Sequence, residues 1–239
     1  MLRASAVCAV SAVGPTVGAS GVVFLNASDN RANLDSAALN IAAGSIVLAC
    51  VAKGISAGVV APTDNAGNSY TQRGSKNYAV WSSSGTILYA ATGVTGGSSV
   101  VLRESMAADN NDEATMSVIE VRGGSTLTVA TPTEVADNSP GATSPVSSPS
   151  LTTSGPAVLV SWWFGNGGGA QQTLSAGNGF TKVHDVDFND VSAAGTTSSS
   201  RIQVGCATRI VTGAGTYSCS WTASTPDQGA ILYLAAIEP

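Results

Sequence analysis

Two stretches decide how this chain is interpreted: AAGSIVLACVA at residues 42–52 and TSGPAVLVSWW at residues 153–163. Each is followed by a glycine-containing loop and then by a related hexapeptide, AGNSYT at 66–71 or AGNGFT at 176–181. Further on, YAATGVTGGSSVVL at 89–102 is matched by CATRIVTGAGTYSC at 206–219, so the blocks recur in one order with offsets of 111, 110 and 117 residues. This recurrence predicts two copies of one structural unit whose loops differ in length.

The length fits this prediction, because 239 residues suit two units of roughly 115 residues, each large enough to bury a core. We expect the first unit to span residues 1–124 and the second to span 125–239, and we expect each to fold alone. Residues 131–150 carry four prolines and little that could fill a core. Since the first unit also has an irregular leader before its repeat block, we interpret this segment as the leader of the second unit.

The pattern of apolar residues predicts β-strands throughout. No window keeps apolar positions at a helical period, and Gly or Pro interrupts the chain about every ten residues. Continuous apolar runs such as SIVLACVA are typical of strands buried on both faces. We therefore predict an all-β fold made of two tandem β-sandwich modules, with jelly-roll and immunoglobulin-like topologies both open. The expected strands are 1–13, 20–25, 46–52, 78–82, 86–92, 98–103, 114–121, 158–164, 180–186, 202–208, 216–222 and 231–237.

The first residues, MLRASAVCAVSAVG, have the outline of a signal peptide, with one Arg before a run of small apolar residues. These residues are mostly alanine, however, and serine interrupts them. We expect an ordered strand here instead of a cleaved leader, and hence a protein assembled in a cytoplasm.

Cys206 and Cys219 lie symmetrically about a turn centred on Thr212 and Gly213. A hairpin at this turn would place the two residues directly opposite one another, so a disulfide between them is conceivable. The alternative, which we favour for an unprocessed chain, is a pair of small buried thiols.

Charge excludes one class of partner. Lys, Arg, Asp and Glu together make up only 10% of the residues, where about 25% is usual, and the net charge is −5. Ten thinly spread cations give no basic stripe for phosphates, so a nucleic-acid partner is not expected. Membrane insertion is not expected either, because no apolar run reaches spanning length.

Motifs of catalysis and metal binding are weak. GISAG at 54–58 matches the nucleophile-elbow pattern around Ser56, but no helix signal follows it and the only histidine, His184, belongs to the other unit. We therefore expect no catalytic residues and no cofactor. Two acidic clusters could offer oxygen ligands to Ca²⁺, or could be solvated loop tips. Their candidate ligands are Asp109 and Asp112 in the first cluster, and Asp185 and Asp190 in the second.

A few aromatic residues lie in or beside predicted loops with polar neighbours. Exposed aromatic rings next to Asp, Asn and Ser are typical of carbohydrate-binding sites, because the ring packs on the apolar face of a sugar. The candidate glycan-binding residues are Trp81, Trp163 and Phe188, with Asp187 as a polar partner, and core packing is the alternative role for the aromatics.

The order of GSIVLA, DNAGNSYT, LYAATGVTGG and SVIEVRGG resembles β-sandwich repeats of bacterial surface proteins and of structural proteins of tailed phages and phage-derived particles. This resemblance implies a non-enzymatic structural or attachment component of a virion-like particle, such as a head spike, decoration protein or fibre module. The expected partners are other particle proteins, further copies of this chain and a cell-surface polysaccharide. A secreted bacterial carbohydrate-binding or adhesin module is the alternative, with an extracellular location.

Overall fold

The computed structural model describes residues 14–25, 31–54, 59–79, 82–106, 114–135, 145–167, 173–185, 201–224 and 230–239, and the regular structure in these ranges is all β-strand. The predicted all-β fold class is confirmed. The strands of the first half are β1 (Thr16–Leu25), β2 (Asn33–Asp35), β3 (Leu39–Ile41), β4 (Ile46–Lys53), β5 (Thr63–Asp64), β6 (Thr71–Asn77), β7 (Gly85–Thr92), β8 (Gly97–Val100), β9 (Leu102–Ser105) and β10 (Ala114–Arg122). Those of the second half are β11 (Thr126–Val129), β12 (Thr133–Val135), β13 (Val146–Ser147), β14 (Leu151–Thr153), β15 (Ala157–Gly167), β16 (Leu174–Ala176), β17 (Thr181–Asp185), β18 (Arg201–Val211), β19 (Gly215–Tyr217), β20 (Ser220–Ala223) and β21 (Ala230–Glu238).

Each half contributes one large sheet and two small ones, in the same strand order. The large sheets are β1-β10-β4-β7-β6 and β11-β21-β15-β18-β17, and β12 also pairs with β21. The small sheets are β2-β9-β5 and β3-β8 in the first half, and β13-β20-β16 and β14-β19 in the second. We call the two halves unit 1 and unit 2. Gly124 lies between β10 and β11, where the first set of strands ends and the second begins.

The correspondence between the units extends to individual hydrogen bonds. In unit 1 the Ser36 amide donates to Leu102 O at 2.8 Å, and the Leu102 amide donates to Ser36 Oγ at 3.0 Å. In unit 2 the Ser148 amide donates to Cys219 O, and the Cys219 amide donates to Ser148 Oγ, both at 2.9 Å. This pair of bonds aligns Leu102 with Cys219, at the offset of 117 residues that the sequence blocks give.

The strand order distinguishes between the two predicted topologies. In each unit the first strand pairs with the last, and the last pairs with the long apolar strand, β4 or β15. An immunoglobulin sandwich would instead place its first strand beside its second. The observed order therefore differs from that of an immunoglobulin sandwich, and the first strand pairs with the last in both units.

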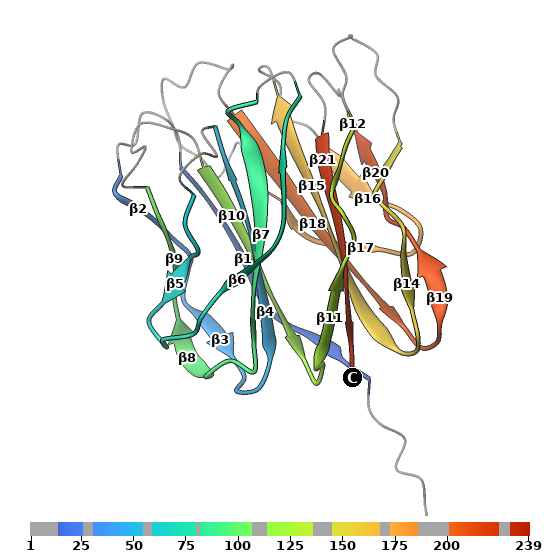
Figure 1. Cartoon of the computed structure of the whole chain (residues 1–239), viewed down its shortest axis with the longest axis horizontal. Helices are drawn as coiled ribbons and strands as arrows, with labels where there is room; N and C mark the ends of the chain where they lie inside the picture. Colours follow the sequence, from blue (N-terminus) through green and yellow to red (C-terminus); the bar gives the residue numbers. More distant parts are fainter. Residues whose placement is uncertain are drawn as a thin grey trace, which may run out of the picture.

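The two large sheets pack face to face, and the small sheets cover their outer faces, so the chain forms four β layers (Figure 1). A central core between the large sheets draws on both units, and two outer cores lie inside the individual sandwiches. Along β4, Ile46, Leu48 and Cys50 face the central core while Val47 and Ala49 face the outer core of unit 1. Burial on both faces explains why these strands are continuous apolar runs without polar alternation.

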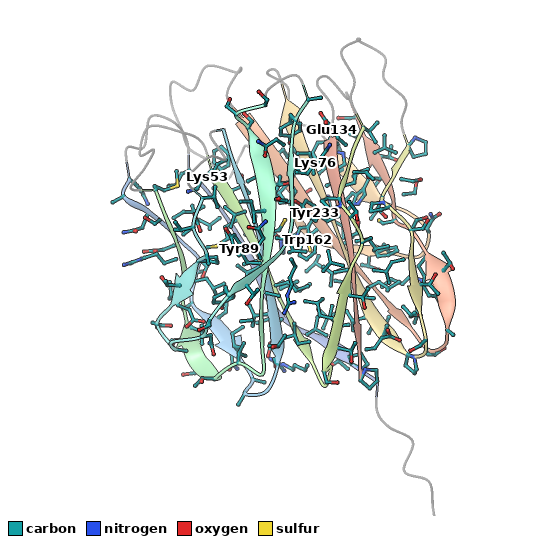
Figure 2. The ribbon with its side chains drawn as sticks, in the orientation of Figure 1. Lys53, Lys76, Tyr89, Glu134, Trp162 and Tyr233 are labelled. Atoms are coloured by element: carbon teal, nitrogen blue, oxygen red, sulfur yellow. The ribbon has the colours of Figure 1, made fainter. Side chains whose placement is uncertain are left out.

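Where the two large sheets face each other, their strand orders run in opposite directions. Strand β1 packs against β17, and β6 lies beside β12, where Lys76 Nζ is 3.8 Å from Glu134 Oε2 (Figure 2). The Ala79 amide also donates to Glu134 Oε1 at 2.7 Å. Because the first edge of one sheet covers the far edge of the other, the two units are related by an approximate twofold axis.

A carboxylate near the end of the last strand closes the turn before the long strand in each unit. Glu120 accepts hydrogen bonds from the Ala42 amide at 2.7 Å and from Ser45 Oγ at 2.8 Å. Glu238 accepts from the Ser154 amide at 2.8 Å and from Ser154 Oγ at 2.7 Å. Burial raises the pKa of Glu120, but its bonds, first that from Arg122, outweigh this and lower it overall.

Two expectations from the sequence are wrong. The predicted strand at 78–82 is displaced, because β6 ends at Asn77. The predicted hairpin between Cys206 and Cys219 does not form: β18 pairs with β15 and β17, whereas β19 and β20 pair with strands of the small sheets. The turn at Thr212 and Gly213 therefore connects two layers of the sandwich. Asn178, in the AGNGFT turn of unit 2, has a positive φ of 56°, which asparagine tolerates.

The shared central core bears on whether each unit folds alone. Separating the chain at Gly124 would expose the apolar inner face of both large sheets, including Trp162, Phe164 and Tyr233. We predict that fragments 1–124 and 125–239 are insoluble or aggregate when expressed singly, and form a soluble complex when co-expressed. Size-exclusion chromatography with far-ultraviolet circular dichroism measures this. Two separately soluble, folded and non-associating fragments would contradict the prediction.

Candidate functional site

Most of the predicted site residues lie outside the described part of the chain. These are Trp81, Phe188 and Asp187 of the glycan site, and Asp109, Asp112 and Asp190 of the calcium clusters. Ser56, in the GISAG match, also lies outside it. The roles proposed for the glycan and calcium residues outside the described ranges stay predictions.

Trp163 is not available to a sugar. Its side chain is 4% exposed and packs in the outer core of unit 2, with its ring over Gly165. The assignment of Trp163 as an exposed glycan contact is therefore wrong, and the alternative of core packing holds. Alternation does separate Trp163 from Trp162 and Phe164, but the face opposite these two is a second core and not solvent.

Asp185 forms an ion pair with Lys182, whose Nζ is 2.6 Å from Asp185 Oδ2. Within the described ranges no three His, Cys, Asp or Glu side chains gather in a way that could hold a metal ion. Asp185, the described member of the second acidic cluster, is thus paired with Lys182 of the same strand.

The two cysteines of the expected hairpin are free and buried. Cys206 faces the central core, whereas Cys219 lies in the outer core of unit 2, so the second large sheet separates them. Burial raises the pKa of both thiols. The arrangement agrees with the favoured interpretation of two small buried thiols.

A polar cluster lies inside the central core. Trp162 Nε1 donates to Ser117 Oγ at 2.8 Å, and Ser117 Oγ lies 2.7 Å from His184 Nε2. Ser117 comes from unit 1 and the other two residues from unit 2, so the fold brings together a serine and a histidine that the sequence does not connect. His184 Nδ1 is buried and finds no hydrogen-bond partner among the described residues.

This serine–histidine pair has the distance of a nucleophile and its base, but not the environment. Ser117 is 0% exposed, so no substrate can reach its hydroxyl in this structure. Burial lowers the pKa of His184 to about 4, and no described carboxylate contacts Nδ1 to stabilise an imidazolium. The cluster fixes the neutral imidazole against Ser117 and joins the two units.

The lowered pKa of His184 predicts a pH-dependent stability. An unfolded histidine titrates near 6.5 and the folded one near 4, so between these values only the unfolded state binds the proton. The free energy of unfolding should therefore fall as the pH is lowered from 6.5 to 4, by at most about 3 kcal/mol. Urea unfolding at several pH values measures this.

His184→Gln is the matched control, because the chain has one histidine and the variant removes it. Its stability should lack this loss. Glu104, whose pKa is raised by burial, would act in the opposite direction in both proteins. Equal pH profiles for the two proteins would contradict the assignment.

A buried ion pair spans the sandwich of unit 1. Lys53 Nζ at the end of β4 lies 2.9 Å from Glu104 Oε1 on β9, and their side chains are 4% and 0% exposed. Lys53 also donates to Ser105 O at 2.8 Å, while neither carboxylate oxygen has a well-aligned hydrogen bond from a described group. Burial raises the pKa of Glu104, and Lys53 opposes this. At the position of unit 2 equivalent to Glu104, the buried residue is Trp221.

In unit 2 the position equivalent to Glu104 is thus filled by an uncharged side chain. This predicts how substitutions of the ion pair change the stability of unit 1. Lys53→Met leaves Glu104 buried without a cation and should destabilise the protein by about 3–5 kcal/mol. Adding Glu104→Leu should recover most of that loss, because both desolvation penalties disappear. Denaturant unfolding of the wild type, both single variants and the double variant tests this. Additive losses in the double variant would contradict it.

The described surface also has a polar groove of about 420 Å³ in unit 2, lined by Asn178, Gly179, Arg209, Thr216, Tyr217 and Ser218. We call it the Arg209 groove. The Arg209 guanidinium lies 5.0 Å from the centroid of the Tyr217 ring, and Nη1 donates to Asn178 O at 2.6 Å. Asn178 Nδ2 in turn donates to Ser218 O at 3.2 Å, and Tyr217 OH to Gly213 O at 3.1 Å. These contacts hold a cation, an aromatic ring and amide and hydroxyl groups at fixed positions.

The sequence predicted no role for Arg209 and Tyr217, which flank the turn at Thr212 and Gly213. The signal was present in CATRIVTGAGTYSC, where one cation and one aromatic residue flank a turn between two layers. A turn of this kind brings Arg209 and Tyr217 to one end of the sandwich, beside the AGNGFT turn that contains Asn178.

Comparison with known proteins identifies no relative. No protein family matches the chain, and no curated protein or solved structure matches it. In the described ranges, no helix is long and apolar enough to cross a membrane.

Proposed function

We propose that the protein is a non-enzymatic structural and attachment component of a virion-like particle, and that it contacts a cell-surface polysaccharide. The observation that carries the attachment role is the Arg209 groove, in which Arg209, Tyr217 and Asn178 are held open to solvent on a rigid four-layer body. An aromatic ring beside amide and hydroxyl groups suits a sugar, whose rings have an apolar face and a rim of hydroxyls.

The charge of Arg209 narrows the class of sugar. None of the described acidic side chains forms an ion pair with Arg209, and only one of its nitrogens is engaged by Asn178 O. A guanidinium with free donors pairs well with a carboxylate. The ligand that fits is thus a polysaccharide with carboxylate-bearing residues, and repetition of the subunit on a particle would strengthen weak single sites.

The alternative function is a secreted carbohydrate-binding or adhesin module, and the groove would serve it equally. The two differ in export and in assembly, not in the contact with sugar. Recovery of this chain within purified particles would favour the first, and recovery as a free exported protein would favour the second.

A glycan array that includes uronic-acid and sialic-acid polymers tests the sugar contact. We predict binding to acidic glycans that falls roughly 10- to 100-fold in Arg209→Gln, since a hydrogen bond to a charged group contributes about 1.5–3 kcal/mol. Arg73→Gln is the matched control, because Arg73 is an exposed cation on β6 in unit 1. No binding by the wild type, or equal losses in both variants, would contradict the site.

A further inference from the structure

The four outer edges of the two large sheets differ in how they are protected. A sheet edge presents unpaired backbone groups, and natural proteins block such edges with charged residues, proline, bulges or short strands. The edges are β1 and β6 in the first large sheet, and β11 with β12, and β17, in the second.

Three of these edges carry such features. Strand β6 has Arg73 and Lys76, and its register shifts between Gln72 and Gly74. Strand β17 has Lys182 and Asp185, and its register shifts as well. The edge formed by β11 and β12 is divided into pieces of four and three residues, with Pro132 between them.

Strand β1 is different. It has ten residues, TVGASGVVFL, with neither a charge nor a proline, and nearly all of them are half-buried. Its bulge lies between Val17 and Ser20, and the Ala19 amide freed there donates to Glu120 Oε2 at 2.7 Å. From Ser20 to Leu25 the strand pairs regularly with β10, and no described strand pairs with its other side.

We propose that this edge pairs with β1 of a second copy of the chain, as an antiparallel extension of the first large sheet. An uncharged strand can lie against itself without placing like charges opposite one another, which β6 could not do. The contrast with β11 and β12 supports this, because they occupy the same position in unit 2 and are shortened and interrupted there. Backbone hydrogen bonds would form along the edge, and the half-buried Val22, Val23 and Phe24 would be covered further.

Symmetry restricts the register. A twofold axis perpendicular to the sheet keeps each face of one copy continuous with the same face of the other, and it places one residue opposite its own counterpart. We take Ser20 as this residue, because the resulting register pairs residues 16–24 and so uses nearly the whole strand. Because one strand pair is a small interface, the dimer should be weak and concentration-dependent, and should be strengthened within a larger assembly. The pairing rests on β1 alone, so it can fail without the proposed sugar contact failing.

Sedimentation velocity of the full chain over a range of concentrations tests the pairing. We expect a monomer–dimer equilibrium that Ser20→Lys and Ser20→Glu each weaken at least tenfold. Mixing these two variants should restore the dimer, since opposite charges then face one another across the axis. Thr128→Lys is the matched control, because Thr128 is exposed on β11, the equivalent edge of unit 2, and this variant should dimerise like the wild type.

Amide hydrogen exchange of the wild type gives a readout that does not depend on a variant folding. Residues 16–24 should exchange more slowly as the protein concentration rises, while β6, at the opposite edge of the same sheet, should change little. A wild type that stays monomeric at millimolar concentration would overturn the proposal. So would a dimer that Ser20→Lys and Thr128→Lys weaken equally, or one that the mixed variants do not restore.

Discussion

The contact on which the rest of the structure depends is the packing of the two large sheets against each other. It buries the inner face of both sheets, and the small sheets bury the outer faces, so the long strands have no side facing solvent. This explains how a chain with 44% hydrophobic residues and only 10% charged ones remains a compact fold. The two units are repeats in sequence, but the central core makes them one body.

Hydrogen bonds within this core fix how the units are aligned. Tyr78 OH donates to Phe164 O at 2.9 Å, and Tyr233 OH donates to Thr86 O at 3.0 Å, so each bond joins one unit to the other. The bond from Trp162 to Ser117 does the same. A buried polar group left without a partner costs about 1–3 kcal/mol. If one large sheet slid or rotated on the other, several of these hydrogen bonds would break together and their costs would add. Apolar packing alone would tolerate more than one alignment.

The sequence was sufficient for the features that depend on local pattern. Apolar runs located β4, β15 and β21, and the recurring AGN and VTG blocks located the repeat. The layering could not be predicted, because alternation shows that Trp162 and Trp163 face opposite ways but not what lies on each side. The same limit applies to Cys206 and Cys219, where symmetry about a turn suggested a hairpin although the turn connects two layers. Contacts between units, such as that of Ser117 with His184, carry no spacing signal.

The two units differ in their residues at corresponding positions. At the position where unit 2 buries Trp221, unit 1 buries Glu104, which pairs with Lys53. Asp64 of unit 1 accepts hydrogen bonds from Asn68 Nδ2 and Tyr70 OH, whereas the equivalent turn of unit 2 has Leu174, Asn178 and Phe180. In unit 1 the side chains of Asn68 and Tyr70 therefore both donate hydrogen bonds to Asp64. In unit 2 no acid stands there, and the main-chain oxygen of Asn178 orients Arg209 instead. The two units thus differ in their polar groups: in unit 1 the polar side chains of this turn bond to one another, whereas unit 2 presents a cation and an aromatic ring to the surface.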